Sequence, residues 1–515
     1  MTRAVVIGGG IAGLAAAALL AKDGYRVTLL EGRDALGGRV GSWERDGFRW
    51  DTGPSWYLMP EVFDHFFRLM GTTAEEQLNL VTLDPGYRVY FEGETEPIDI
   101  AATREQNLEL FERIEPGSRR SMERYLDSAE ETYEIAKRRF LYTSFASIRP
   151  LLRADVLTRM PRLARLLLQP LATKAERTVA DPRLRQVLGY PAVFLGSSPY
   201  LAPSMYHLMS HLDLDGGVMY PMGGFTRLVD AVTGLARSAG AELRTGAEVT
   251  GIVVEGGRVT GVRVGEELIA ADIVVSAADL HHSETRLLPE PLQTYPQEYW
   301  DERVPGPGAL LILLGVRGEL PRLGHHSLFF ARDWKEGFER IFGAETSLPD
   351  PASLYVCKPS GVDPSVAPEG HENLFVLVPI PADPSLGRGE VDGDGTAVLE
   401  ALADRVVRQI GDWAGIPDLQ DRVVVRRTIG PGDFAADLHS WRGTALGPAH
   451  TLRQSAMFRA RNASGRVDGL YYAGGSTIPG IGLPMCLISA EVLLKRLRGD
   501  ISTEALAEPL ESTIR

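Results

Sequence analysis

The residues with the clearest chemical meaning lie near the start of the chain, where Gly8, Gly10 and Gly13 have the spacing Gly-x-Gly-x-x-Gly. The first glycine of such a motif permits a tight strand-to-helix turn, the second lets the backbone approach a pyrophosphate, and the third lets the helix pack on the strand. Glu31 follows the next apolar run, where its carboxylate can accept hydrogen bonds from ribose hydroxyls and repel a 2′-phosphate. This pattern predicts a dinucleotide site.

Two further groups of residues favour FAD over a nicotinamide dinucleotide. Gly37, Gly38 and Arg39 place a glycine pair and a cation just beyond Glu31, where they could reach a second phosphate. Gly53 and Pro54 belong to a turn of small residues that could run close to a flat ring system.

The C-terminal region repeats the same physical pattern. Residues 470–477 predict a strand that runs into the glycine turn at Gly474 and Gly475, and Pro484 and Met485 open a helical stretch to residue 497. A second helix N-terminus close to glycine N–H groups could meet a ribityl chain, a pyrophosphate or a ring edge. We also expect a cofactor contact at Val249, where a strand begins.

The elements that must position these residues follow from apolar patterning and from turn residues. We expect strands at 4–7, 26–30 and 271–276, a helix at 14–22, a hairpin turning at Gly256-Gly257, mostly helical structure over 103–190, and sheet strands at 309–316 and 374–380. The predicted fold class is α/β, a Rossmann-like FAD-binding domain with an inserted helical membrane or lid region and a mixed-sheet substrate domain. The predicted segments are 1–85, 220–285 and 430–500 for the FAD-binding domain, 86–219 for the helical region, 286–429 for the substrate domain and 501–515 for a frayed tail.

Composition excludes several classes of protein. The net charge of −14 over 515 residues gives no global positive field for nucleic acid, so no nucleic-acid partner is expected. The two cysteines, Cys357 and Cys486, support neither a disulfide framework nor a Cys-based zinc site, and they fit a reducing cytoplasm. The apolar stretch at residues 4–21 could be mistaken for a signal peptide or a membrane anchor, but its glycines and the strand that follows contradict that. No other stretch approaches the ~20 apolar residues that a membrane-spanning helix needs.

One segment reverses the overall charge. Residues 137–174 contain nine Lys or Arg and a single acid, Asp155, interleaved with leucines that include Leu151 and Leu152. This composition suits an anionic membrane surface and predicts peripheral docking that opens a path for an insoluble substrate. The alternative is a lid with a solvated basic face and a core-packed apolar face.

The whole chain resembles the bacterial-type phytoene desaturases, a carotenoid-forming family of the flavin amine-oxidase-like superfamily. The resemblance rests on the motifs above, on 51–54, 220–224, 441–447 and 454–456, and on 477–484, with departures from the family at Ile478 and Ala490. It implies FAD-dependent desaturation of a long apolar polyene, phytoene toward lycopene or a related intermediate, with hydride passing to the flavin and with oxygen or a quinone as electron acceptor. A carotene isomerase, an amine oxidase-like flavoenzyme and a lipid-binding protein that does not use flavin remain alternatives.

The resemblance nominates Asp181 and Arg185 as residues near the substrate. A helix-start role for Asp181, with Pro182 at the first helical position, is the competing interpretation. The histidine pairs at 281–282 and 325–326 are expected to be structural, because adjacent residues point to different faces and no carboxylate or Cys pattern accompanies them, so no metal is predicted.

Overall fold

A five-stranded parallel sheet forms the nucleotide end of the molecule. The computed structural model describes residues 1–146 and 159–513. The strand order is β19-β13-β1-β2-β9, and the bounds are β1 (Arg3–Ile7), β2 (Arg26–Leu30), β9 (Glu242–Arg244), β13 (Ile273–Ser276) and β19 (Leu470–Tyr472). The sheet therefore joins segments from both ends and the middle of the chain.

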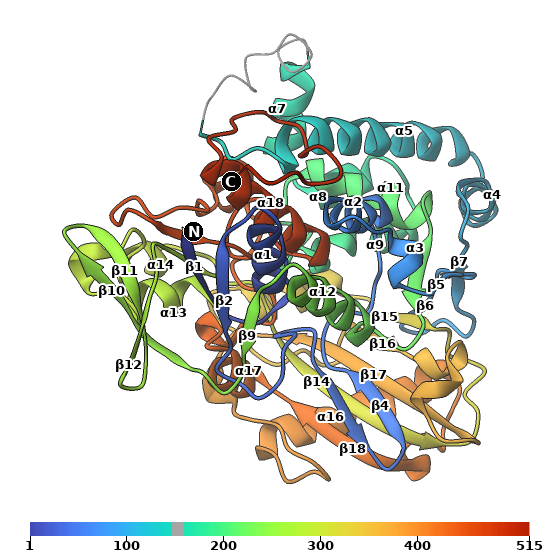
Figure 1. Ribbon diagram of the computed structural model, residues 1–515. Coiled ribbons are helices and arrows are strands. Elements are labelled where there is room, and N and C mark those ends of the chain that lie inside the picture. The colour runs from blue at the N-terminus through green and yellow to red at the C-terminus, as the bar shows by residue number, and fades with distance from the viewer. Residues whose placement is uncertain (147–158, 514–515) are drawn as a thin grey trace.

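Both faces of this sheet are covered, as its continuous apolar strands require. Along β1, Ala4 and Val6 pack against the helices on one face, while Val5 and Ile7 pack on the opposite side against a small antiparallel sheet. Figure 1 shows α1 and α12 beside β1 and β2, with β10–β12 on the left. The helices of that face are α1 (Ile11–Lys22), α2 (Pro60–Met70), α12 (Thr226–Ser238) and α18 (Leu483–Leu497), and the small sheet is β10 (Val249–Glu255), β11 (Arg258–Val264) and β12 (Glu267–Ala270).

A seven-stranded mixed sheet forms the second layer, in the lower right of Figure 1. Its order is β18-β14-β17-β16-β15-β6-β7. Its strands are β6 (Tyr87–Phe91), β7 (Ile98–Ile100), β14 (Gly308–Arg317), β15 (His326–Phe330), β16 (Leu354–Cys357), β17 (His371–Ile380) and β18 (Val423–Ile429). One face packs on α16 (Ala397–Ala414), and the other packs beneath the helical region described next.

The described helices between residues 104 and 214, which follow β7 in the sequence, form the upper part of Figure 1. They are α4 (Arg104–Ile114), α5 (Arg119–Ala136), η1 (Lys137–Leu141), α7 (Met160–Leu168), α8 (Leu171–Glu176), α9 (Pro182–Gly189), α10 (Pro191–Phe194), η3 (Ser204–Leu208) and α11 (Met209–Leu214). The remaining elements of five or more residues are α13 (Leu280–Thr285), α14 (Gln297–Asp301), α15 (Trp334–Phe342) and α17 (Pro431–Leu438). Short strands β3 (Ser42–Arg45) and β4 (Phe48–Asp51) pair with each other, as do β5 (Leu80–Leu83) and β8 (Val218–Pro221).

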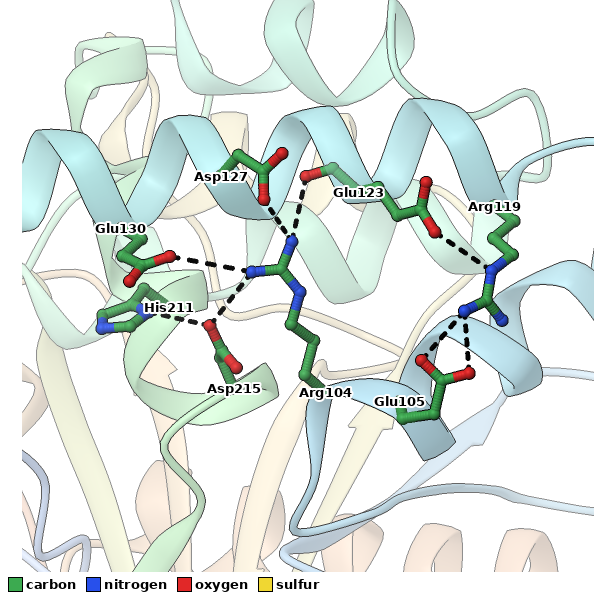
Figure 2. Close-up of polar contacts among 8 residues, drawn as sticks. All are labelled: Arg104, Glu105, Arg119, Glu123, Asp127, Glu130, His211 and Asp215. Carbon is green, nitrogen blue, oxygen red and sulfur yellow. Dashed lines mark hydrogen bonds and ion pairs between the residues drawn. The ribbon is translucent and has the colours of Figure 1, made fainter.

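Ion pairs fasten the helical region together (Figure 2). Arg104, at the start of α4, reaches Asp127 and Glu130 on α5 and Asp215 just after α11, the last at 3.5 Å. Arg119 bonds Glu105 at 2.7 Å and Glu123 at 3.1 Å. These contacts hold α11 against α5, next to the cavity described below.

Two sequence expectations need comment. The hairpin turn at Gly256-Gly257 is confirmed, with β10 and β11 antiparallel and both glycines at positive φ. The expectation of a frayed tail is wrong for the described residues, because Leu510 is buried and its N–H donates to the carbonyl of Leu69, and Thr513 donates to Asp23. Mixed charge and a proline do not prevent such a segment from packing on the rest of the protein when one of its apolar side chains, here Leu510, is buried there.

Candidate active site

The glycines of the first motif lie where β1 turns into α1. Gly8 has φ +98°, which other residues rarely adopt, and a Cβ on Gly13 would lie 1.9 Å from the carbonyl oxygen of Gly8. A Cβ on Gly10 would have no neighbour closer than 3.9 Å, and Gly10 lines a large cavity. The first and third glycines thus build the turn, and the second leaves the backbone open to a ligand.

Glu31 lies at the end of β2 on the wall of the same cavity. Its Oε2 accepts a hydrogen bond from the Gly9 N–H at 2.6 Å, and its Oε1 accepts one from the Arg33 N–H at 3.0 Å. These bonds fix the direction of the carboxylate. Each oxygen keeps a second lone pair, which suits the hydroxyl donors of a ribose.

The second half of the N-terminal pattern lies against the first. A Cβ on Gly38 would lie 3.1 Å from the Cα of Gly10, and a Cβ on Gly53 would lie 1.9 Å from the carbonyl oxygen of Arg39. Arg39 donates to the carbonyl of Ala445 and to Ser440 Oγ, both at 2.9 Å. The close backbone approach explains why small residues occupy these positions.

A second helix N-terminus opens on the same cavity. α18 begins after Gly482, and like α1 it has no side chain that caps its first N–H groups. Around these two N-termini the cavity wall includes all the remaining predicted cofactor contacts: Gly38, Arg39, Gly53, Pro54, Val249, Gly474, Gly475, Pro484 and Met485. Uncapped N–H groups and the positive helix end together favour an anionic ligand.

These residues fit FAD. The α1 N-terminus and Gly10 would hold the diphosphate, Glu31 the ribose, and the segments around Gly53 and Gly474 the flavin end. The cavity has a volume of about 1200 Å³, above the ~300–1,000 Å³ of ordinary small-molecule pockets. It therefore has room for more than one ligand.

The rest of the cavity wall is mainly apolar and comes from the seven-stranded sheet, from α15, from the segment after β4 and from the helical region. It includes Trp56, Leu163, Leu167, Tyr190, Phe194, Leu208, Leu311, Leu328, Phe330, Trp334, Phe338, Tyr355 and Phe375. Such a wall binds a ligand by excluding water, with few directional contacts.

Sequence reasoning missed several of the polar groups at this wall. Ser55 and Tyr355 share a hydrogen bond of 2.7 Å between their hydroxyls, and His326 Nδ1 lies 2.7 Å from the Tyr355 hydroxyl. Ser55 and Trp56 directly follow Gly53 and Pro54, so the turn already pointed to them. Nothing local marks Tyr355, and His326 stood out only as a member of a histidine pair that was expected to be structural.

Cys357 lies opposite His326 across the β15–β16 pair, which the sequence could not show. The ligand atoms of His325, His326 and Cys357 lie within 4.8 Å of one another. Zinc bonds of ~2.0–2.3 Å would draw three such atoms closer together. Burial lowers the pKa of His325 to about 3 and raises that of Cys357 to about 12, so both are neutral.

Asp181 and Arg185 are not part of the cavity wall. Asp181 is the N-cap of α9, where it accepts a hydrogen bond from the Arg183 N–H and pairs with the Arg183 guanidinium at 2.8 Å. Arg185 donates to the carbonyl of Val179 at 3.0 Å. Their contacts are those of a helix start, and the geometry gives neither a place beside a substrate.

Part of the basic, leucine-rich segment lies over the cavity. Leu151, Leu152 and Asp155 fall outside the described residues, but α7 contributes Leu163 and Leu167 to the cavity wall. Arg159 and Arg162 pair with Glu131 of α5, while Arg165 and Leu168 are exposed. Over the described ranges, no helix is both long enough and apolar enough to span a bilayer.

Comparison with known proteins agrees with this geometry. Residues 11–491 match the model of the flavin containing amine oxidoreductases. The chain is 41% identical over 497 residues to the carotenoid 3,4-desaturase of Haloarcula japonica, covering 96% of this chain and 98% of that one. It is 36% identical over 498 residues to the zeta-carotene-forming phytoene desaturase of Myxococcus xanthus, covering 96% and 93%.

Solved structures share the fold at low identity. An oxidoreductase from Methanosarcina mazei matches with a TM-score of 0.59 at 16% identity, covering 96% of this chain and all of that one. A putrescine oxidase with bound putrescine matches with a TM-score of 0.60 at 14% identity, covering 97% and 98%.

The fold and site define an FAD-dependent oxidoreductase of mixed α/β architecture. The chain belongs to the flavin-containing amine oxidoreductase family and, by its relatives, to the carotenoid desaturases within it. The family resemblance inferred from the motifs is thereby confirmed.

Proposed function

We propose that this enzyme introduces double bonds into a long acyclic carotenoid, converting phytoene toward lycopene or acting on a related polyene. The observation that carries the proposal is one continuous cavity whose glycine-lined end fits FAD and whose remaining wall is mainly apolar, with residues from the seven-stranded sheet and from the helical region. A small soluble substrate would not need so long an apolar wall. The names of the two relatives reported above describe reactions of carotenoids, and this supports the assignment.

When bound, FAD supplies the hydride acceptor. The residues of the chain exclude water and hold the polyene so that a saturated C–C bond beside the conjugated system faces the reacting end of the cavity. Loss of a hydride, with both electrons of the C–H bond, leaves an allylic carbon positively charged. A proton then leaves the neighbouring carbon and is released to solvent, and the electron pair of that C–H bond forms the new double bond.

Phytoene desaturation and terminal 3,4-desaturation differ only in which C–C bond is presented. The name of the relative from Haloarcula japonica supports 3,4-desaturation for this chain, and the name of the relative from Myxococcus xanthus supports phytoene desaturation. The cavity supports either, because most of its wall away from the glycine-lined end is apolar and can hold a polyene in more than one position. We propose that oxygen or a quinone reoxidises the flavin.

We also propose that the enzyme works at the cytoplasmic membrane surface, with α7 and the basic segment around it as a lid that docks there. The support is the position of α7: Leu163 and Leu167 face the cavity while Arg165 and Leu168 are exposed. A polyene could then pass from lipid to cavity without crossing water. We further propose that the segments predicted from the sequence are the functional divisions of the chain, with two changes. β6 and β7 belong to the sheet of the substrate domain, and the described part of the tail packs on the rest of the protein.

The decisive experiment supplies the FAD-loaded enzyme with phytoene or lycopene in liposomes, under oxygen or anaerobically with a quinone. Conversion of colourless phytoene into coloured polyenes, resolved by chromatography, would support phytoene desaturation. If only lycopene is converted, and its products absorb light at longer wavelengths than lycopene does, terminal desaturation would be favoured. Oxidation of soluble amines with neither carotenoid consumed would replace the proposal with an amine oxidase.

A further inference from the structure

Aromatic side chains gather around Trp56 at the cavity wall. Its ring centroid lies 4.4 Å from that of His326, 5.1 Å from Phe194, 5.3 Å from Tyr87 and 6.2 Å from Tyr190. Trp56, Tyr190 and Phe194 line the cavity, and Phe330 beside Tyr190 does so as well. The faces of such rings carry partial negative charge and attract cations.

A buried carboxylate bonds to two of these aromatic residues. Asp213, at the end of α11, is 3% exposed, and its Oδ2 accepts hydrogen bonds from Tyr190 at 2.7 Å and Tyr87 at 2.9 Å. In the described ranges no Lys, Arg or His forms an ion pair with it. The site thus holds a buried acid that bonds to two neutral hydroxyls and to the backbone N–H groups of residues 213 and 214. One of the hydroxyls belongs to Tyr190, a residue of the cavity wall.

The groups that face Asp213 are themselves neutral. Tyr87 comes from β6, Tyr190 follows α9, and Tyr125 of α5 lies near enough for Asp213 to raise its pKa. Asp215, two residues on, belongs to the outer network with Arg104 and His211. Burial raises the pKa of Asp213 from 3.8 to about 7, against the opposing effect of the hydrogen bonds from Tyr190 and Tyr87.

A buried carboxylate without a counter-ion destabilises the folded protein, and an apolar side chain packed in its place would make the fold more stable. We infer that Asp213, acting through Tyr190, is the counter-charge for a positively charged species held against the aromatic wall around Trp56. This inference rests on the proposed function, in which loss of a hydride leaves a cationic polyene. Asp213 does not line the cavity, so it is a positioning and electrostatic residue rather than a catalytic one.

Binding tests this independently of turnover. The FAD-loaded enzyme is titrated with a long-chain trimethylammonium compound and with its uncharged tert-butyl isostere, both below micelle-forming concentrations. Perturbation of flavin absorbance and of Trp fluorescence reports occupancy. At pH 8 the ammonium compound is expected to bind more tightly than the isostere, by on the order of tenfold.

Asp213→Asn should abolish this preference while leaving binding of the neutral isostere unchanged. Asp215→Asn is the matched control and should keep the preference. The wild-type enzyme also provides a test that needs no variant: lowering the pH from 8 to 6 should protonate Asp213 and reduce the preference. Tyr190→Phe, which keeps the ring but removes the hydroxyl, should weaken it.

Equal binding of the two compounds by the wild-type enzyme at pH 8, or an unchanged preference in Asp213→Asn, would overturn the inference. The two proposals fail separately. If carotenoids are not converted but the charge preference depends on Asp213, the counter-charge stands and the substrate assignment falls; flavin reduction by primary amines would then identify the cation as a protonated amine. If carotenoids are converted without any charge preference, the desaturase assignment stands alone.

Discussion

The guanidinium of Arg39 donates to the carbonyl oxygen of Ala445 at 2.9 Å, so the N-terminal glycine motif is fastened directly to the C-terminal part of the cavity wall. The same side chain reaches Ser440. Arg39 therefore holds two parts of the cavity wall together, and we propose that it also offers its charge to a phosphate of the cofactor.

Replacing Arg39 should weaken FAD binding through this double role. Arg39→Met removes both the charge and the two hydrogen bonds and should raise the FAD dissociation constant by about a hundredfold, the effect of losing ~2–3 kcal/mol from charged hydrogen bonds. Arg39→Lys keeps the charge but not the planar fork, so an intermediate loss is expected. Flavin fluorescence during titration of apoenzyme measures both. Equal affinity of Lys and wild type would show that only the charge matters.

Gly13→Ala should disrupt the cofactor site and the fold around it. The added Cβ would lie 1.9 Å from the backbone oxygen of Gly8, which cannot move without opening the β1–α1 turn. We expect a loss of several kcal/mol in stability and loss of bound FAD.

Gly234→Ala provides the control for this change. Gly234 lies inside α12 with no atom within 4 Å of an added Cβ. This variant should be stabilised by ~0.5–1 kcal/mol and should keep its flavin. Thermal unfolding and flavin content measure both variants, and similar behaviour of the two would contradict the steric explanation.

The cofactor end was predictable from sequence because its requirements are local. Gly8, Gly13 and Glu31 belong to one strand-helix-strand unit, and the turn, the close packing and the terminal acid have fixed spacing. The structure extends the first helix back to Ile11, so the predicted start at residue 14 was three residues late. Helix ends are the least certain part of such predictions. The first N–H groups of α1 have no side-chain cap, so no capping residue marks its start in the sequence.

The substrate wall was not predictable in the same way. Trp56, Tyr190, Phe330 and Tyr355 meet only when the segment after β4, the seven-stranded sheet and the helical region pack together, and each alone is an ordinary apolar core residue. Asp213 gives no signal in sequence, since its importance comes from its burial beside two tyrosines without an ion-pair partner among the described residues. Family resemblance identified the reaction class, but it nominated Asp181 and Arg185, which lie away from the cavity.

Asp213 should also affect how stability depends on pH. Its pKa is raised from 3.8 to about 7, so between these values the folded protein holds more protons there than the unfolded chain. The free energy of unfolding should therefore fall as pH rises through that window, by a few kcal/mol. Asp213→Asn should remove this contribution, as measured by urea unfolding at pH 4.5, 6 and 7.5.

Asp215 gives a contrast of opposite sign. A hydrogen bond from His211 lowers its pKa, so its stabilising contribution is present at neutral pH and is lost as pH falls. Asp215→Asn should cost stability at pH 7.5 and little in acid. If both variants changed the pH dependence in the same direction, the burial argument for Asp213 would fail.

Membrane docking should depend on the exposed side of α7. Leu168 is 74% exposed and Arg165 is exposed on the same short helix, whereas Arg159 and Arg162 already pair with Glu131. Leu168→Gln with Arg165→Gln should reduce binding to anionic liposomes several-fold, because apolar insertion and attraction to anionic lipid are both lost. Flotation with vesicles of phosphatidylglycerol measures this.

The matched control is Leu268→Gln, which removes a 55% exposed leucine from β12 on the small antiparallel sheet. It should bind liposomes as the wild type does. Both variants should keep full flavin content, since none of the three substituted residues lines the cavity. Unchanged flotation of the α7 variant would mean that α7 is a lid that opens to water rather than to lipid, and the substrate would then need another route from the membrane.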